Sequence, residues 1–320
     1  MEAGEEAKLT RGSGKPLRVG VFGTGAMGRN HVRLLAALPE AELVGVHDPR
    51  PEAAESAARE HGARVFDRVD DLAAGIEAAV VAVPTESHAL LGCDLLSRGL
   101  HVLIEKPLAP DLPQADRLLA AADGRVLAVG HVEFFNPAVQ ALLAVGIPPR
   151  FVEVQRLGVF SPRSLDVDVI LDLMIHDLQI LHALDPSPVA EVRATGIAVL
   201  SHRIDIANVR IELASGCVAN LTASRVSSER VRKLRTFLPS RYYSLDYQAQ
   251  EIRGYRLEES GGERRILPDN LPLEKAEPLK RELEAFVAAC RGEDVPIVSG
   301  AHARQALETA LAVVEAIKPA

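Results

Sequence analysis

The sequence predicts an α/β protein: a doubly wound parallel sheet in the first part of the chain, then an α+β domain with an open, mostly antiparallel sheet. Two observations predict this fold class. In the first part, short runs rich in Val, Ile and Leu alternate with helical stretches, as in a parallel sheet covered on both faces. In the second part, longer segments alternate apolar and polar residues, which is typical of antiparallel strands.

The first part alternates strands and helices in order. The predicted strands are 17–23, 41–48, a short one near Val65, 78–84, 101–107 and 125–131. The predicted helices between them are 26–38, 51–62, 87–99 and 114–123. Gly99 ends one of these helices, and Pro107 ends one of the strands.

The second part has a different pattern. Segments near 150–161, 189–215 and 216–258 alternate as antiparallel strands do, with a turn at 214–216. A strong helix is predicted at 170–184, and helices at 277–291 and 301–317 close the chain. We therefore expect a flexible polar tail at 1–15 and two domains, 16–130 and 131–320, as the length of 320 residues also suggests.

Composition excludes several classes of protein. Apolar residues make up 48% of the chain and charged residues 25%, which is ordinary for a globular protein and unlike a collagen or a disulfide scaffold. No apolar run reaches the ~18–20 residues that span a bilayer, so we expect no membrane association. The net charge of −8 argues against nucleic acid as a partner. Three widely spaced cysteines and a polar start without an apolar leader favour the cytoplasm.

A glycine motif carries the first functional signal. Residues 23–28 read GTGAMG, a G-x-G-x-x-G that closes a predicted strand and opens a helix. The first glycine permits a tight turn, the second lets a pyrophosphate approach the backbone, and the third lets helix and strand pack closely. Asp48 ends the next strand, where a carboxylate binds the adenosine ribose, which favours NAD; Arg50 leaves room for NADP as the less expected cofactor. This context predicts a Rossmann domain.

Two further segments suggest catalysis. Lys106 follows a strand end, where ligands of parallel sheets bind, and a lysine there can stabilise an alkoxide. On the helix at 170–184, Asp172, His176 and Gln179 form a narrow polar stripe on an otherwise apolar surface. A histidine with a nearby carboxylate suits a general base near neutral pH. A surface lysine and a satisfied core histidine are the alternative interpretations.

A metal site is another possible interpretation of the same helix. Acidic and imidazole groups are dense there, at Asp166, Asp168, Asp172, His176 and Asp177. Their spacing matches no standard ligand pattern, so we expect no metal.

The chain resembles the Gfo/Idh/MocA family of NAD(P)-dependent oxidoreductases. The motifs that carry the resemblance are GTGAMG at 23–28, VAVPTESH at 81–88, EKP at 105–107 and DLMIHD at 172–177. The resemblance implies that Lys106, Asp172 and His176 are catalytic. It also implies homodimers or homotetramers formed through the open sheet of a substrate-binding and oligomerisation domain. Segments 129–139 and 156–178 resemble the UDP-N-acetylglucosamine 3-dehydrogenase branch, although Phe134 stands where that branch usually has arginine.

The resemblance and the motifs together define an expected site. The expected cofactor contacts are Gly23, Gly25, Ala26, Met27, Gly28, Asp48, Arg50, Pro84, Thr85, His88 and Glu105. The expected substrate contacts are Arg163, Arg156 and Asn136, with Arg241 as a further candidate for a diphosphate. The arginines could equally form surface salt bridges.

The resemblance implies oxidation of a secondary sugar hydroxyl, and most specifically of C3 of UDP-N-acetylglucosamine. The 3-keto product would then be used to make an amino sugar for lipid A or a surface glycan. Two alternatives stay open. One is the same chemistry on another sugar or inositol, and the other is an NAD(P)-binding sensor without catalysis.

Overall fold

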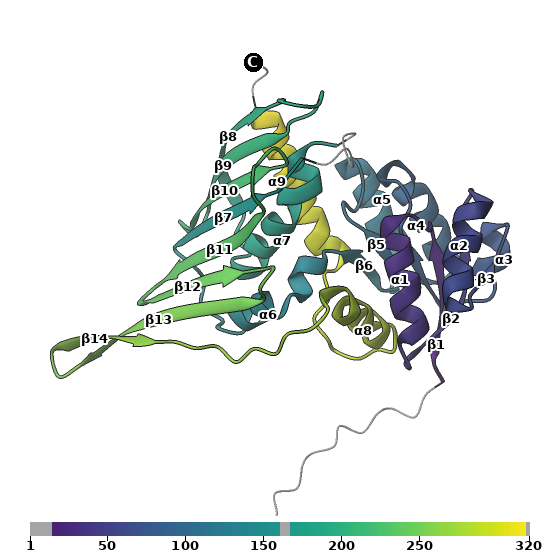
Figure 1. The fold of residues 1–320 in the computed structure, drawn as a ribbon, viewed down its shortest axis with the longest axis horizontal. Coiled ribbons are helices and arrows are strands. Elements are labelled where there is room, and N and C mark those ends of the chain that lie inside the picture. The colour runs from purple at the N-terminus through teal and green to yellow at the C-terminus, as the bar shows by residue number, and fades with distance from the viewer. Residues whose placement is uncertain (1–14, 161–166, 318–320) are drawn as a thin grey trace, which may run out of the picture.

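The computed structural model describes residues 15–160 and 167–317, and the chain forms two sheets with helices between and around them (Figure 1). The expected tail at 1–15 lies outside the described residues except for Lys15. The fold class is the expected one: a parallel sheet first, then a mostly antiparallel sheet.

The first sheet has six parallel strands in the order β3-β2-β1-β4-β5-β6. Its strands are β1 (Leu17–Phe22), β2 (Ala41–His47), β3 (Arg64–Val65), β4 (Ala78–Val81), β5 (His101–Glu105) and β6 (Leu127–Gly130). The strands alternate with α1 (Ala26–Ala37), α2 (Pro51–His61), α3 (Val69–Ala73), α4 (His88–Ser97) and α5 (Leu112–Ala122). Continuous Val, Ile, Leu and Ala runs form these strands because both faces of the sheet are covered.

The second sheet has eight strands in the order β14-β13-β12-β11-β7-β10-β9-β8. They are β7 (Phe151–Leu157), β8 (Val189–Ile197), β9 (Ile206–Leu213), β10 (Val218–Ser224), β11 (Val231–Leu238), β12 (Arg241–Asp246), β13 (Glu251–Ser260) and β14 (Glu263–Pro268). All neighbours are antiparallel except β7 and β10. Gly216 has φ +83° and closes the predicted turn between β9 and β10.

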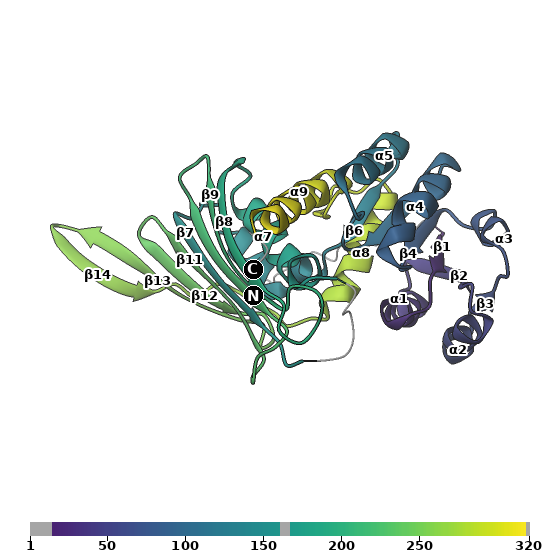
Figure 2. The same cartoon turned by 90° about the horizontal axis from the view of Figure 1, so that it is seen from above.

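The remaining helices lie between the sheets or against the first one. They are α6 (Pro137–Leu143), α7 (Ile175–Leu184), α8 (Pro278–Cys290) and α9 (Gly300–Ala316). Seen from above, α7 and α9 lie between the two sheets, and no labelled helix covers the far face of the second sheet (Figure 2).

Two apolar cores hold these layers together. One joins one face of the first sheet to α1, α2 and α8, and it includes Leu283 and Phe286 of α8. The other lies on the opposite face of that sheet and continues through α7 and α9 to the second sheet. Because α8 belongs to the first core although it follows the second sheet in sequence, the C-terminal part of the chain is needed to cover the first sheet.

The predicted helices other than 170–184 agree with the observed boundaries to within two residues, whereas the short helices α3 and α6 were not predicted. There the chain forms a π-helical turn over Ile170–Met174 and continues as α7. No helix in the described ranges is long and apolar enough to cross a membrane.

Candidate active site

The functional segments of the first sheet share one edge because their strands are neighbours. Register pairs Phe22 of β1 with Val81 of β4, Val81 with Ile104 of β5, and Glu105 with Gly130 of β6. The chain that follows each of these parallel strands therefore emerges at the same carboxyl edge, which is where open α/β sheets bind ligands.

The glycine turn after β1 is built as a phosphate cradle. A Cβ at Gly28 would lie 1.9 Å from the Gly23 carbonyl oxygen, and one at Gly23 would lie 2.4 Å from that of Ala82. At Gly25, by contrast, nothing lies within 4 Å of the added atom, so the backbone faces open space at the start of α1. Ala26 and Met27 are exposed beside it. These residues fit a dinucleotide pyrophosphate held at a helix N-terminus.

Asp48 lies beside this turn, and both of its carboxylate oxygens accept hydrogen bonds from neighbouring residues. Its carboxylate accepts hydrogen bonds from the Thr24 backbone N–H at 2.8 Å and hydroxyl at 3.0 Å, and from Arg50 Nε at 3.1 Å. Burial alone would raise the pKa of Asp48, but the bonds from Arg50 and Thr24 outweigh it and lower that pKa below its usual range. The carboxylate is ionised and fixed against the glycine turn, while the Arg50 side chain is mostly exposed.

The segment after β4 reaches the same edge. Pro84 is exposed and Thr85 half-buried. His88 is buried, and its ring nitrogens lie 2.9 Å from the Pro107 carbonyl oxygen and 3.0 Å from that of Val83. Since a neutral imidazole has one N–H, it donates to one of these two at a time. His88 thus ties the loop after β4 to the loop that carries Lys106.

Glu105 faces the interior instead of the open edge. Its carboxylate lies 2.7 Å from Nε2 of His31 on α1 and accepts a 3.3 Å bond from the Lys106 backbone N–H. Glu282 of α8 comes within 4.8 Å of both side chains. These contacts anchor the end of β5 to the helices that cover the first sheet.

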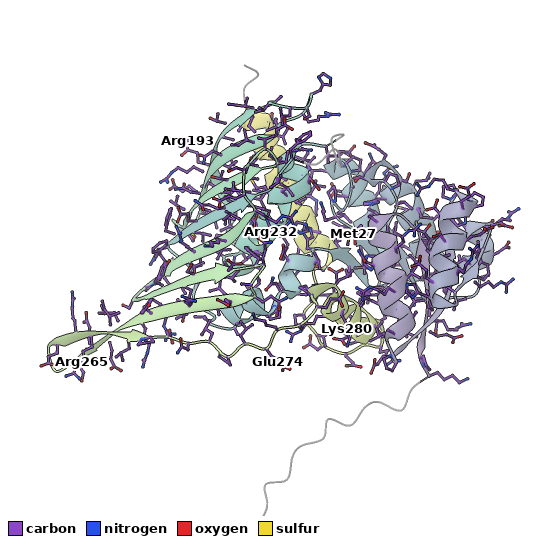
Figure 3. The ribbon with its side chains drawn as sticks, in the orientation of Figure 1. Met27, Arg193, Arg232, Arg265, Glu274 and Lys280 are labelled. Atoms are coloured by element: carbon purple, nitrogen blue, oxygen red, sulfur yellow. The ribbon has the colours of Figure 1, made fainter. Side chains whose placement is uncertain are left out.

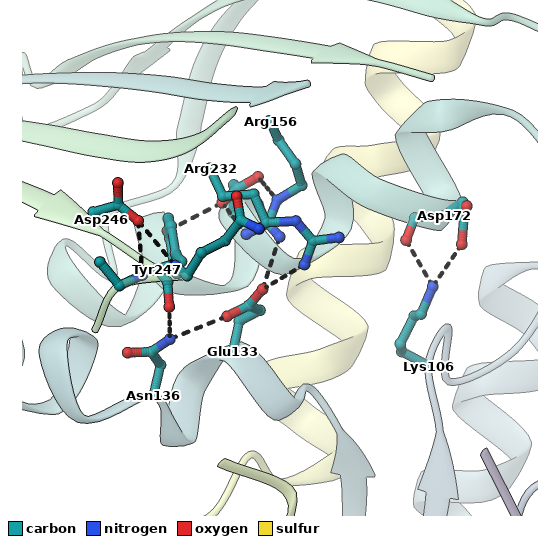
Figure 4. Close-up of polar contacts among 11 residues, drawn as sticks. Lys106, Glu133, Asn136, Arg156, Asp172, Arg232, Asp246 and Tyr247 are labelled. Carbon is teal, nitrogen blue, oxygen red and sulfur yellow. Dashed lines mark hydrogen bonds and ion pairs between the residues drawn. The ribbon is translucent and has the colours of Figure 1, made fainter. Parts of the chain in front are cut away.

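Lys106, after β5 of the first sheet, and Asp172, just before α7, lie in direct contact (Figure 4). The Lys106 Nζ donates to the Asp172 carbonyl oxygen at 2.6 Å and to its carboxylate at 3.0 Å. Both side chains are partly exposed. Asp172 sits in the π-helical turn that precedes α7, a feature often found at functional sites.

His176 opens α7 next to this pair and is buried. Burial and the charge of Lys106 lower its pKa well below the usual value, so the ring is neutral at neutral pH. Asp172, in the π-helical turn before α7, bonds Lys106, so the carboxylate that the sequence places near His176 holds the ammonium group.

The sequence-based predictions do not include His131, which stands beside His176. The two rings pack edge to face with centroids 5.5 Å apart, and neither nitrogen of His131 has a hydrogen-bond partner in the described structure. Burial, followed by the Lys106 charge, lowers the pKa of His131 to about 3. Its position directly after β6, beside the strand of Lys106, was the signal that could have found it.

Two expected substrate contacts are instead parts of a buried ion network. Arg156 is 3% exposed and bonds Asp177 through Nε at 2.6 Å and Nη2 at 2.8 Å. Its Nη1 bonds Glu133 at 2.9 Å, and the guanidinium lies over the Tyr247 ring at 4.9 Å. Asn136 is also buried: it caps α6 through Ala138 N–H and donates to the Tyr247 carbonyl. Both side chains are buried and bonded within the protein.

The other charged candidates have separate positions. Arg163 and Asp166 lie outside the described residues. Arg241, on β12, bonds Asp269 at 3.0 Å. Asp168 accepts bonds from the Ile170 and Leu171 N–H groups, so it caps the π-helical turn.

Comparison with known proteins decides the family. Residues 17–131 match the family model described as an oxidoreductase family with an NAD-binding Rossmann fold. The chain is 37% identical over 307 residues to the UDP-N-acetylglucosamine 3-dehydrogenase of Acidithiobacillus ferrooxidans, across 94% of this chain and 97% of that protein. The chain belongs to the Gfo/Idh/MocA oxidoreductase family. As a member, it is an NAD(P)-dependent sugar dehydrogenase with a Rossmann domain for NAD.

Two further comparisons place the chain within this family. A solved structure of the Acidithiobacillus enzyme matches with a TM-score of 0.86, covering 95% of this chain and 98% of that one. Inositol 2-dehydrogenase 2 of Paenarthrobacter aurescens is 27% identical over 307 residues, across 90% of this chain and 91% of that protein.

Proposed function

We propose that this enzyme oxidises the C3 hydroxyl of UDP-N-acetylglucosamine with NAD, giving a 3-keto sugar nucleotide for amino-sugar synthesis that supplies lipid A or a surface glycan. The observation that carries the proposal is the Lys106–Asp172 pair beside a neutral His176, at the same edge as the open Gly25 backbone. The near full-length similarity to a 3-dehydrogenase supports the choice of substrate.

The three side chains divide the work at the substrate hydroxyl. An ammonium group has three N–H donors, and Lys106 uses two of them on Asp172, which leaves one for the substrate oxygen. That bond stabilises the negative charge that develops on the oxygen. Asp172 positions Lys106, and neutral His176 accepts the hydroxyl proton. NAD, when bound, supplies the acceptor for the hydride that leaves the carbon bearing this hydroxyl.

The cofactor contacts follow from the cradle. Residues 23–28 would hold the pyrophosphate, Asp48 and Arg50 the adenosine ribose, and Pro84 and Thr85 the nicotinamide side. His88 and Glu105 would act indirectly, since each holds a strand end by hydrogen bonds within the protein. In this division, 16–130 binds the cofactor and 131–320 the substrate, with α8 covering the cofactor domain.

Assembly and location complete the proposal. We propose a homodimer or homotetramer formed through the uncovered face of the second sheet. There Phe237 lies 5.4 Å from Phe151 and 5.0 Å from Tyr242, measured between ring centroids, and is 37% exposed. Light scattering after gel filtration tests the assembly. A cytoplasmic location is supported by the three cysteines, all of which are free thiols.

NADH formation with a substrate panel tests the function. The panel is UDP-N-acetylglucosamine, UDP-N-acetylgalactosamine, UDP-glucose, glucose and myo-inositol. We expect turnover of UDP-N-acetylglucosamine, and borodeuteride reduction of the product should place deuterium at C3. Turnover of myo-inositol alone would replace this substrate with a free polyol, the class named for the Paenarthrobacter relative.

A further inference from the structure

A pair of arginines faces each other directly in the second sheet. Register places Arg232 of β11 opposite Arg156 of β7, so the two side chains leave the same face of the sheet. Like charges in this position repel unless acids lie between them. Glu133 fills that place, and its Oε1 accepts from Arg156 at 2.9 Å and from Arg232 at 3.3 Å.

The two arginines are unequally neutralised. Arg156 is enclosed, with three of its N–H groups on Asp177 and Glu133. Arg232 pairs with the same Glu133 oxygen as Arg156, but at 3.3 Å instead of 2.9 Å. The Arg232 side chain is 36% exposed. Burial, then the charge of Arg156, lowers the pKa of Arg232. Arg232 is therefore a partly desolvated cation with most of its N–H donors unused among the described residues.

Arg232 also lies on the catalytic side of the network. Its charge is one of those that lower the pKa of His176. In the view of Figure 4, its guanidinium lies between the Arg156–Glu133 cluster and the Lys106–Asp172 pair. Figure 3 shows Arg232 on the side of the second sheet that faces the Rossmann domain. An anion bound there would therefore lie on the side of the second sheet that packs against α7, the helix that carries His176.

We propose that Arg232 binds an anionic group of the substrate, which for a sugar nucleotide is its diphosphate. This inference rests on the proposed function for the identity of the anion. The planar guanidinium can present two parallel N–H groups to phosphate oxygens. The bound anion would neutralise the Arg232 charge, which Glu133 offsets only in part because it also pairs with Arg156. The cofactor's own phosphates are a separate source of negative charge, and they belong at Gly25 on the other domain.

Calorimetric binding of UDP alone tests this role, because it needs no turnover. Arg232→Gln should weaken UDP binding at least about tenfold, as expected for loss of a charged hydrogen bond, and should leave NADH affinity within about twofold. The control is Arg98→Gln, directly after α4. Arg98 is partly exposed and bonds Asp94 at 3.0 Å and Asp70 at 2.7 Å, so its loss should change neither affinity.

Kinetics provide the second measurement. In Arg232→Gln, KM for the UDP-sugar should rise at least about tenfold while kcat changes less. Arg232→Lys, which keeps the charge and loses the planar fork, should fall between wild type and the glutamine variant. If the glutamine variant does not fold, the lysine variant alone must still weaken UDP binding.

The outcomes separate the two proposals. UDP affinity unchanged in Arg232→Gln overturns the role of Arg232, whatever the substrate is. Weakened UDP binding in an enzyme that oxidises none of the UDP-sugars supports this role and rejects the proposed function. An equal decrease in NADH and UDP affinity would assign Arg232 to the cofactor and overturn the inference. A wild-type enzyme that binds neither UDP nor a sugar 1-phosphate would also overturn it.

Discussion

The Lys106 ammonium is bonded twice to Asp172, through the carboxylate at 3.0 Å and through the backbone carbonyl at 2.6 Å. The double contact joins the loop after β5 to the π-helical turn before α7. It fixes the direction of the ammonium and so of its third N–H. In the proposed mechanism, this N–H is already directed toward the oxygen on which negative charge develops before the substrate binds.

Removing the ammonium should therefore abolish turnover without removing the cofactor. Lys106→Met is expected to lower kcat by about a thousandfold, the upper range for loss of one donor to a developing oxyanion. Asp172→Asn keeps the backbone carbonyl contact and should lower kcat less, by about ten- to a hundredfold. Steady-state kinetics and NADH titration measure both effects, with Lys280→Met on the exposed face of α8 as the control. Substantial activity in Lys106→Met would reject the assigned role.

The glycine turn offers a pair of substitutions with opposite consequences. Gly28→Ala places a Cβ 1.9 Å from the Gly23 carbonyl oxygen, so the backbone must move and the protein should lose several kcal/mol of stability or fail to fold. Gly25→Ala meets nothing within 4 Å, so its melting temperature should stay near that of wild type. Its methyl group would occupy the space of the pyrophosphate, and NADH affinity should fall at least about tenfold.

Melting curves and NADH titrations distinguish these effects. Gly75→Ala is the control, because its added Cβ would make only ordinary contacts at 3.6 and 3.7 Å and it lies outside the cradle. Unchanged NADH affinity in Gly25→Ala would mean that the dinucleotide binds elsewhere.

Most of the fold and part of the site could be predicted from the sequence. Continuous apolar strands and the glycine motif predict the first sheet because they depend on local pattern. The polar stripe that contains Asp172 could be read from helical spacing, but its bond to Lys106 depends on a π-helical turn that this spacing does not predict. Arg156 and Asn136 look like free polar groups in sequence, and only packing against Asp177 and Tyr247 shows that they are enclosed.

The remaining site residues come from pairings that local patterns do not specify. Arg232 matters because β11 pairs with β7, strands separated by more than seventy residues, and this pairing sets the two arginines opposite each other. Glu282 reaches His31 only because α8 returns to the first sheet.

Buried histidines should make the protein less stable as the pH falls. Burial lowers the pKa of His131 to about 3 and that of His182 to about 4, against an ordinary value of 6.5. Below pH 6.5 the unfolded chain takes up protons that the folded chain refuses, so stability is lost as the pH falls toward the folded values. Each such histidine should reduce the unfolding free energy by about 1.4 kcal/mol per pH unit in that window.

Urea unfolding between pH 6.5 and 5 measures this slope. His131→Gln should reduce this slope by the contribution of one buried histidine, about 1.4 kcal/mol per pH unit. An equal slope in wild type and His131→Gln would contradict the assignment.

Glu282 should have the opposite effect. It is 1% exposed, neither carboxylate oxygen has a hydrogen-bond partner in the described structure, and it lies near His31 and Glu105. Burial, and then the charge of Glu105, raises its pKa well above the ordinary 4.5. Below pH 4.5 the acid is protonated in both states. Above it, the unfolded chain releases a proton that the folded chain keeps, so stability falls as the pH rises toward the folded pKa.

Glu282→Gln removes this titration while keeping the shape of the neutral acid. The variant should therefore gain stability relative to wild type as the pH rises, by about 1.4 kcal/mol for each unit above 4.5 until the folded pKa is reached. Urea unfolding at pH 4.5 and 7 gives the two differences, and Glu284→Gln, on the exposed side of the same helix, is the control. A stability difference between Glu282→Gln and wild type that is the same at both pH values would show that Glu282 is ionised in the folded protein.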